Sequence, residues 1–325
     1  MTINRKQVTK NAWRLTRDRK LTCLRIRVPG GHLKAEYLGI VQKIADDYGR
    51  GTIHLTARQG FEIPGISYDD MAEINKMIKP LIESLELSVE TSDYGYPAAG
   101  TRNISACIGN QVCPVANDDT TRIAKRIERE IYPNNFHFKV AVTGCPNDCI
   151  KAHMQDFGII CTTEPEYDQS KCISCNACVT NCKKKVTGAL SMENFDIIRN
   201  EDLCIGCGEC ISKCPTRAWT RSEDKYYRMV IMGRTGKKNP RIALPFVKWG
   251  SEDMMVQIIK NTYDFVDRYI DRSLAKEHIG YIVDRVGFQV FKEEVLNGIV
   301  INDKAVIAEN IQFGGYFYKS DGNLK

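Results

Sequence analysis

The sequence predicts an α+β protein whose larger part is interrupted by a small cysteine-rich module. Strand-like and helix-like segments alternate along the first ninety or so residues, as the spacing of their apolar residues indicates. Eight of the fourteen cysteines then fall between residues 166 and 221. After this stretch, a further strand and two amphipathic segments complete the chain. These observations favour two folded parts and one insertion.

The N-terminal part is expected to span residues 1–92. Apolar residues recur at helical spacing from Leu33 to Tyr48, and glycines on either side interrupt the pattern. The predicted order is strand, helix, strand and helix, over residues 24–28, 32–48, 52–56 and 69–87. The apolar positions of these elements are assigned to the core.

The second part is expected to combine residues 93–165 with 222–325, on either side of the insertion at 166–221. Its first segment, 93–114, is rich in Gly, Pro and small residues and predicts a loop. Helices are expected over 117–131, 252–272 and 276–296, and strands over 136–142, 157–161 and 227–233. A basic loop at 234–241 and a tail at 298–325, either a small hairpin or partly ordered, complete the prediction.

Composition narrows the environment and the partners. The N-terminus lacks the apolar run of a signal peptide, and no stretch approaches the roughly 18 apolar residues of a membrane span. We therefore expect a cytoplasmic protein without membrane insertion, whose cysteines are metal ligands. The net charge of +6 is compatible with nucleic acid, an anionic cofactor or an anionic substrate as partner, and equally with a mildly basic surface that binds none of them. The basic residues are too scattered to indicate nucleic-acid binding.

The cysteine-rich insertion carries a doubled cluster-binding pattern. The run C-x2-C-x2-C-x3-C occurs twice, at Cys172, Cys175, Cys178 and Cys182 and at Cys204, Cys207, Cys210 and Cys214. This is the spacing of bacterial two-cluster ferredoxins, in which the fourth cysteine of each run ligates the other cluster. We therefore assign Cys214 to the 4Fe–4S cluster of the first run and Cys182 to that of the second. Structural zinc is the alternative, but zinc sites rarely use this doubled quartet.

The lysines after the first run depart from the ferredoxin pattern. Lys183 stands where the run usually continues with proline, which is not a ligand. Residues 183–185 are read as a solvated turn, or else as a docking patch for an acidic redox partner.

A second constellation combines C-x5-C with C-x3-C, at Cys107, Cys113, Cys145 and Cys149. Together with GTRNISACIGNQVC, FKVAVTGCPNDC and GRGTIHLTARQGFEIPGI, it resembles the siroheme-dependent sulfite and nitrite reductase superfamily. The likeness covers most of residues 20–250 outside the insertion. The inserted ferredoxin makes the chain most similar to the catalytic subunit of anaerobic, dissimilatory-type sulfite reductases. The resemblance implies a ferredoxin-like half-domain within 1–92 and a siroheme and 4Fe–4S domain in the second part.

This resemblance also implies a cofactor set and a reaction. Siroheme would be coupled through Cys149 to the 4Fe–4S cluster of the second constellation, which makes three clusters with those of the insertion. The expected reaction is the six-electron reduction of sulfite to sulfide. Family members bind the oxyanion with two arginines and two lysines, and the matching positions here are Arg58, Arg102, His137 and Lys139.

His137 is a departure, because a lysine is expected at its position. Either the imidazole donates protons in place of the lysine, or another basic residue does so and His137 is structural. Lys139 favours sulfite, because siroheme nitrite reductases tend to carry Asn at the matching position.

Siroheme bears eight carboxylates, which call for cationic and hydrogen-bonding groups around its rim. The candidates are Arg25, Arg27, Arg58, Gln59, Thr101, Asn103, Arg234, Lys237, Lys238 and Arg241. The loop at 234–241 is expected to bind the cofactor, and the alternative is that it forms an ordinary basic surface turn.

Electrons are expected to come from other chains, because no nicotinamide or flavin fingerprint stands out. The resemblance implies a flavin subunit that oxidises NADH and an additional iron–sulfur subunit. A single half-domain copy suggests an oligomer. The competing functions are a siroheme nitrite reductase, a non-catalytic iron–sulfur electron-transfer subunit, and a siroheme protein acting on another small oxidised substrate.

Overall fold

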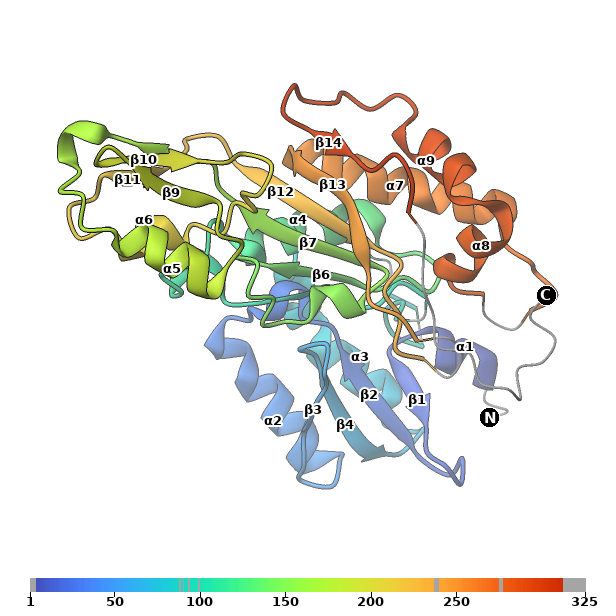
Figure 1. Ribbon diagram of the computed structural model, residues 1–325. Coiled ribbons are helices and arrows are strands. Elements are labelled where there is room, and N and C mark those ends of the chain that lie inside the picture. The colour runs from blue at the N-terminus through green and yellow to red at the C-terminus, as the bar shows by residue number, and fades with distance from the viewer. Residues whose placement is uncertain are drawn as a thin grey trace. The chain divides into compact units, whose positions relative to one another are not determined.

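The computed structural model describes residues 4–87, 89, 91–92, 94–98, 100–236, 240–274 and 277–311 (Figure 1). It divides into two compact units. Unit 1 comprises Met1–Ala106, Thr121–Ala141 and Ile259–Asn297, and unit 2 comprises Cys107–Thr120, Val142–Ile258 and Gly298–Lys325. These units cut across the three parts expected from the sequence. The cysteine-rich insertion groups with the segments that flank it, and residues 93–106, 121–141 and 259–297 belong to unit 1. None of the described helices is long and apolar enough to cross a membrane.

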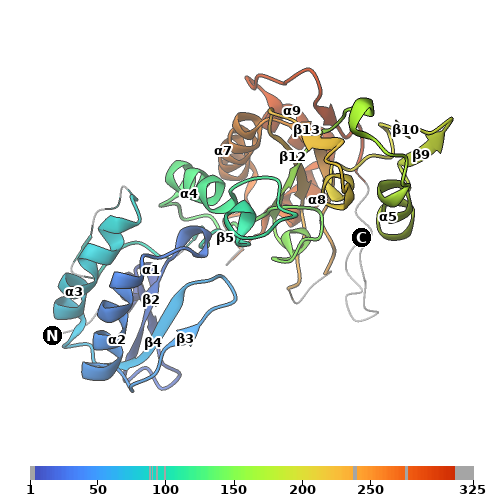
Figure 2. The same ribbon diagram turned by 90° about the vertical axis from the view of Figure 1, so that its left-hand side faces the viewer.

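Unit 1 contains a four-stranded antiparallel sheet in the order β1-β2-β4-β3. Its strands are β1 (Trp13–Leu15), β2 (Thr22–Ile26), β3 (His54–Leu55) and β4 (Phe61–Ile66). Helices α2 (Leu38–Asp47) and α3 (Met71–Ser84) lie side by side next to this sheet (Figure 2). Alternate residues of β2 are buried, as expected for a strand with one face on the core.

Two differences from the predicted elements of unit 1 have local causes. The helix expected at 32–48 begins only at Leu38, because a 3₁₀ turn at Ala35–Tyr37 precedes it. Strand β4 was not predicted, since Pro64 and Gly65 are residue types that strands disfavour. Pro64 is accommodated opposite Cys23, next to a shift in the β2–β4 register.

The second sheet has six strands in the order β14-β13-β12-β7-β6-β5. They are β5 (Ser105–Ala106), β6 (Val140–Thr143), β7 (Phe157–Thr162), β12 (Tyr226–Ile231), β13 (Leu244–Gly250) and β14 (Val306–Ile307). Every residue of β6 and β7 is buried, which explains why both read as continuous apolar runs. The strand expected at 136–142 begins only at Val140.

The cysteine-rich insertion lies between β7 and β12. Strands β8 (Pro165–Tyr167) and β11 (Trp219–Arg221) pair at its base, and β9 (Leu190–Glu193) pairs with β10 (Asp196–Arg199). Helices α5 (Ala177–Lys185) and α6 (Glu209–Lys213) follow the two cysteine loops and contact each other. A small core of apolar side chains and cysteines holds these elements together.

The remaining helices are α1 (Arg5–Lys10), α4 (Thr120–Ile131), α7 (Glu252–Tyr269), α8 (Ile279–Val286) and α9 (Phe288–Leu296). The prediction of a single helix over 276–296 was wrong, because two helices occupy this range. Gly287 adopts a φ of 105°, which ends α8 and begins α9. In the predicted tail, β14 adds an edge strand to β13 rather than forming a hairpin of its own, and residues 312–325 lie outside the described chain.

Candidate functional site

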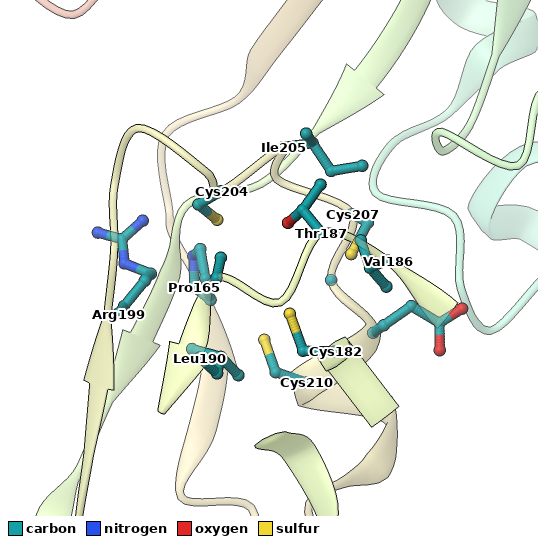
Figure 3. A pocket seen from close by; sticks show the side chains of 13 residues that line it. Pro165, Cys182, Val186, Thr187, Leu190, Arg199, Cys204, Ile205, Cys207 and Cys210 are labelled. Carbon is teal, nitrogen blue, oxygen red and sulfur yellow. The ribbon is translucent and has the colours of Figure 1, made fainter. Parts of the chain in front are cut away.

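One cavity of unit 2 collects four cysteine thiols. The residues that line it include Cys182, Cys204, Cys207 and Cys210 (Figure 3). We call these four residues the second set. Helix α5 supplies Cys182 and α6 supplies Cys210, and the two sulfur atoms point into the same space. The sequence predicts these four cysteines as the ligands of one cluster, including the cross-over of Cys182.

Burial and mutual repulsion disfavour the charged, thiolate forms of the second set. Burial, with a smaller contribution from negative charge at Cys204, raises the pKa of Cys207 to about 11. Burial raises the pKa of Cys210 to about 12, with Cys207 and Cys204 acting in the same direction. Buried thiolates that repel one another become stable only beside positive charge, and a metal cluster supplies that charge. The donor set therefore fits a 4Fe–4S cluster.

We call Cys172, Cys175, Cys178 and Cys214 the first set. The sulfur of Cys172 accepts a hydrogen bond from the backbone N–H of Ser174 at 3.4 Å, and that of Cys214 accepts one from Ala218 at 3.2 Å. Burial raises the pKa of Cys178, and the charge of Cys214 adds to this effect. Cys214 thus lies within electrostatic range of the first run. Among the residues that the structure describes, no three His, Cys, Asp or Glu side chains are arranged to hold a single metal ion.

Cys107, Cys113, Cys145 and Cys149 form the third set, also in unit 2. The N–H of Cys107 donates to the carbonyl of Val142 at 3.1 Å, and its sulfur accepts from the N–H of Gly144 at 3.0 Å. Burial raises the pKa of Cys145, and negative charge at Cys113, Cys107 and Cys149 acts in the same direction, so these three thiols lie within electrostatic range of Cys145. Cys145 is buried, whereas Cys149 is exposed.

The loop that carries Cys149 is anchored by a contact that the sequence analysis missed. Asp148 has a φ of 49°. Its carboxylate accepts hydrogen bonds from the N–H groups of Ala152 at 2.6 Å and His153 at 3.1 Å, and contacts Nδ1 of His153 at 2.7 Å. These bonds fix the backbone next to Cys149. Asp and Asn tolerate the left-handed region, and the sequence NDC was a signal for such a turn.

Unit 1 contains a cationic pocket made of two neighbouring cavities, of about 230 and 680 Å³. Arg14, Arg25 and Arg102 line both of them. The smaller cavity adds Arg27, Arg58 and Asn103, and the larger one adds Lys10 and His137. Arg14 was not predicted, because it stands in a strand of only three residues that has no motif around it.

The charges in this pocket are poorly balanced. Burial lowers the pKa of Arg25 to about 10, and repulsion from Arg14 and Arg102 contributes. Burial and the same kind of repulsion lower the pKa of Arg102. Glu62 is the only acid among the lining residues, and it is paired with Arg14 at 2.8 Å. Nε of Arg25 has no hydrogen-bond partner within the described chain. This arrangement suits an anionic ligand.

Several predicted rim residues hold unit 1 together. Arg27 is buried, forms an ion pair with Glu128 and donates to the carbonyl of Thr101 at 2.8 Å. Both amide atoms of Gln59 bond to the backbone of Ala106, at 2.7 and 2.8 Å. The hydroxyl of Thr101 contacts that of Tyr263 at 2.6 Å. Asn103 donates to the carbonyls of Val28 and Arg58, at 3.0 and 2.6 Å. Their contact with a cofactor remains a prediction.

The residues predicted to bind the substrate occupy the same unit. Arg58 donates from Nη1 to the carbonyl of Asn103 at 3.3 Å. Nε of Arg102 donates to Nε2 of His137 at 3.0 Å. Lys139 is half-buried and directly precedes β6.

The two arginines of the loop at 234–241 belong to unit 2 and are buried. Their backbones exchange two hydrogen bonds of 2.9 Å, and Nε of Arg241 donates to the carbonyl of Met232 at 3.0 Å. Because both arginines are buried, they do not belong to an ordinary surface turn, which was the alternative for this loop. Lys237 and Lys238, also predicted as rim residues, lie outside the described residues.

Comparison with known protein families divides the chain in two. A family described as the nitrite/sulfite reductase ferredoxin-like half domain matches residues 14–81. A second, described as the nitrite and sulphite reductase 4Fe-4S domain, matches residues 98–300. The predicted pairing of an α+β half-domain with a cluster-binding domain is therefore confirmed.

Individual relatives agree with these families. The chain is 41% identical to an anaerobic sulfite reductase subunit of Salmonella typhimurium, over 93% of this chain and 91% of that protein. It is 30% identical to a coenzyme F420-dependent sulfite reductase of Methanocaldococcus jannaschii, over 84% of this chain and 42% of that one. Among solved structures, dissimilatory sulfite reductase I has the same fold, with a TM-score of 0.67 at 17% identity over 94% of this chain and 78% of that one.

Proposed function

Because the chain belongs to the nitrite and sulfite reductase family, we propose that it catalyses the siroheme-dependent, six-electron reduction of sulfite to sulfide. The chain is an oxidoreductase of the sulfite reductase class. The observation that carries the specific proposal is the unbalanced positive charge around Arg25 and Arg102 in unit 1. A protein that only passed electrons along would not need an oxyanion-binding pocket.

We assign the third set to the cluster that is coupled to siroheme. Cys107, Cys113 and Cys145 would hold the cluster, and Cys149 would bridge it to the siroheme iron. The exposure of Cys149, together with the burial of Cys145, supports this division of roles. When bound, the coupled siroheme and cluster supply single electrons to the sulfur of sulfite.

The side chains of the cationic pocket bind the cofactor rim and the substrate. Arg25, with an Nε group unsatisfied within the described chain, is the strongest candidate for a siroheme carboxylate. Arg58 and Arg102 bind sulfite oxygens and neutralise charge as it develops on them. Lys139 holds a third oxygen and supplies protons, because each oxygen must leave as water.

The insertion would act as a two-cluster ferredoxin over residues 166–221, with the first and second sets as ligands. Together with the third set, this gives three 4Fe–4S clusters. The domain boundaries 1–92, 93–165 and 222–325 are part of the same proposal. Electrons would come from a flavin subunit that oxidises NADH and from an iron–sulfur subunit, within a hetero-oligomer. The exposed lysines at 183–185 are available to an acidic partner.

An anaerobic optical spectrum tests the proposal, with acid–acetone extraction of the chromophore and counts of iron and acid-labile sulfide. Protein made in a siroheme-competent host should contain siroheme and the iron of three 4Fe–4S clusters. Insertion clusters without siroheme would instead support an electron-transfer subunit. Turnover of nitrite and sulfite by one preparation separates the two reductases, and a clear preference for nitrite would reject the sulfite assignment.

A further inference from the structure

The turn that carries Cys149 contains two non-glycine residues in the left-handed region. Asp148 has a φ of 49° and Lys151 has a φ of 60°. Residues other than glycine rarely adopt such angles, so the turn depends on hydrogen bonds to keep its shape. Within the turn, the N–H of Asp148 donates to the carbonyl of Cys145 at 3.2 Å, and the N–H of Lys151 donates to the carbonyl of Asp148 at 3.0 Å.

The carboxylate of Asp148 extends this bonding beyond the turn. It is only 14% exposed and accepts three hydrogen bonds, from the backbone of Ala152 and from both the backbone and the imidazole of His153. A carboxylate only accepts, so Nδ1 of His153 carries the proton in this contact. Three donors on one side chain fix His153 relative to Cys149.

The backbone around His153 is also bonded to the loop at 234–241, which we call the arginine loop. The carbonyl of His153 accepts a hydrogen bond from the N–H of Ala243 at 2.8 Å, and the carbonyl of Asp156 accepts one from the N–H of Met232 at 2.8 Å. Met232 and Ala243 flank the arginine loop on its two sides. All of these residues belong to unit 2. Both ends of the arginine loop are therefore bonded to the segment that Asp148 fixes.

The approach of the two segments requires a glycine at position 233. A β-carbon there would lie 2.3 Å from the carbonyl oxygen of His153, which is too close for any other residue. Arg234 follows directly and is buried, as is its backbone partner Arg241, and Nε of Arg241 donates to the carbonyl of Met232 at 3.0 Å. The two buried arginines therefore stand on backbone that contacts His153.

We propose that Asp148 and His153 are positioning residues that hold the turn of Cys149 and the arginine loop in one fixed arrangement. The thiolate of Cys149 and the two buried arginines are then presented together to one siroheme. This inference rests on the proposed bridge at Cys149 and on the predicted rim residues Arg234 and Arg241. A cofactor that is bound at its metal and at its rim is retained best when both groups are fixed before it binds, because less freedom is lost on binding.

The first test changes Asp148 and measures siroheme retention by the whole anaerobic protein. Asp148→Gly removes the carboxylate but keeps the left-handed turn accessible, because glycine adopts such angles readily. Siroheme should leave this variant at least tenfold faster than wild type, as its absorbance during timed gel filtration shows, while the iron of the insertion is kept. Asp148→Asn keeps one acceptor oxygen and should lie in between, and His153→Leu should act in the same direction as Asp148→Gly. Exposed Asn194→Gly, at a φ of 47°, is the matched control.

The second test examines the link itself. In siroheme-free protein, the amide of Ala243 should exchange with solvent deuterium at least tenfold faster in Asp148→Gly than in wild type, as mass spectrometry of peptides measures. Conversely, Gly233→Ala should displace the arginine loop from His153 and weaken the magnetic coupling between siroheme and cluster in electron paramagnetic resonance. Gly39→Ala is its control, since a β-carbon at this exposed position meets no other atom within 4 Å.

The outcomes separate this inference from the proposed function. Unchanged exchange at Ala243 in Asp148→Gly would show that Asp148 stabilises only its own turn, and would overturn the inference. Siroheme release from Asp148→Gly at the wild-type rate, or an equal acceleration in Asn194→Gly, would overturn it too. A wild-type protein without siroheme would overturn the proposed function, and the exchange at Ala243 would still decide whether Asp148 holds the arginine loop.

Discussion

The Nε–H of Arg102 donates a hydrogen bond to Nε2 of His137 at 3.0 Å. A guanidinium group can only donate, so Nε2 is the acceptor and carries no proton in this arrangement. The ring of His278 meets the same imidazole edge-on, with 4.6 Å between centroids. His137 therefore holds Arg102 in position, which favours the structural explanation of this departure over proton donation from Nε2.

The effect of substituting His137 on sulfite binding should depend on whether the new side chain can still accept the hydrogen bond from Arg102. His137→Leu removes the acceptor, and we expect the KM for sulfite to rise about tenfold, equivalent to about 1.4 kcal/mol. His137→Gln keeps a side-chain oxygen and should stay within a few-fold of wild type. Steady-state sulfite reduction with a reduced viologen dye measures both. Equal losses in the two variants would show that the hydrogen bond to Arg102 is unimportant.

Lys139 should distinguish the two oxyanions. Lys139→Asn removes a positive charge and a proton source, and sulfite needs both in order to lose its oxygens as water. We expect kcat/KM for sulfite to fall at least tenfold more than that for nitrite, measured on one preparation. Lys43→Asn, on the exposed face of α2, is the control. If both substrates lost activity equally, Lys139 would not determine the preference.

Cys149→Ser should remove the bridge between cluster and siroheme. Hydroxyl oxygen is a poor substitute for a thiolate at a soft metal centre. The variant is expected to lose the siroheme absorbance and sulfite turnover while keeping the iron of the insertion. The optical spectrum and iron count measure this, with Cys23→Ser as control, since Cys23 is half-buried and lies outside all three sets. Retention of full turnover would show that Cys149 is not the bridge.

The charge of Arg25 should lower the free energy of unfolding when no anion is bound. Burial is the main reason that the folded-state pKa of Arg25 is lowered to about 10. The charged form is therefore disfavoured in the folded state, and this penalty is fully present at neutral pH and shrinks only as pH rises above about 10, toward the ordinary pKa of an arginine. Arg25→Met should raise the free energy of unfolding of siroheme-free protein by about 1 kcal/mol at pH 7.

Urea unfolding of siroheme-free protein measures this difference, and exposed Arg5→Met is the control. The advantage of Arg25→Met should stay constant up to about pH 10 and shrink above it. A destabilised variant would mean that the hydrogen bond from Arg25 to the carbonyl of Asn11, 3.1 Å long, outweighs the burial penalty.

The sequence by itself determined the family, the three cysteine sets and most of the regular elements. Cluster ligands depend on short spacings along the chain, so Cys172 to Cys182 and Cys204 to Cys214 could be proposed as ligands from the sequence alone. The helices and central strands were predictable for a similar reason, because burial imposes a local period on apolar residues. The sequence also singled out Arg102, through the motif GTRN, and Arg25 was one of the candidates for the siroheme rim.

Only the tertiary structure decided which charges act together. Arg14 joins Arg25 in the cationic pocket, His278 meets His137, and Arg228 reaches the loop of Cys204. These partners are separated along the chain and lie in segments with no motif of their own. Electrostatic forces depend on distance in space and on burial, and neither quantity is written into the local order of residues.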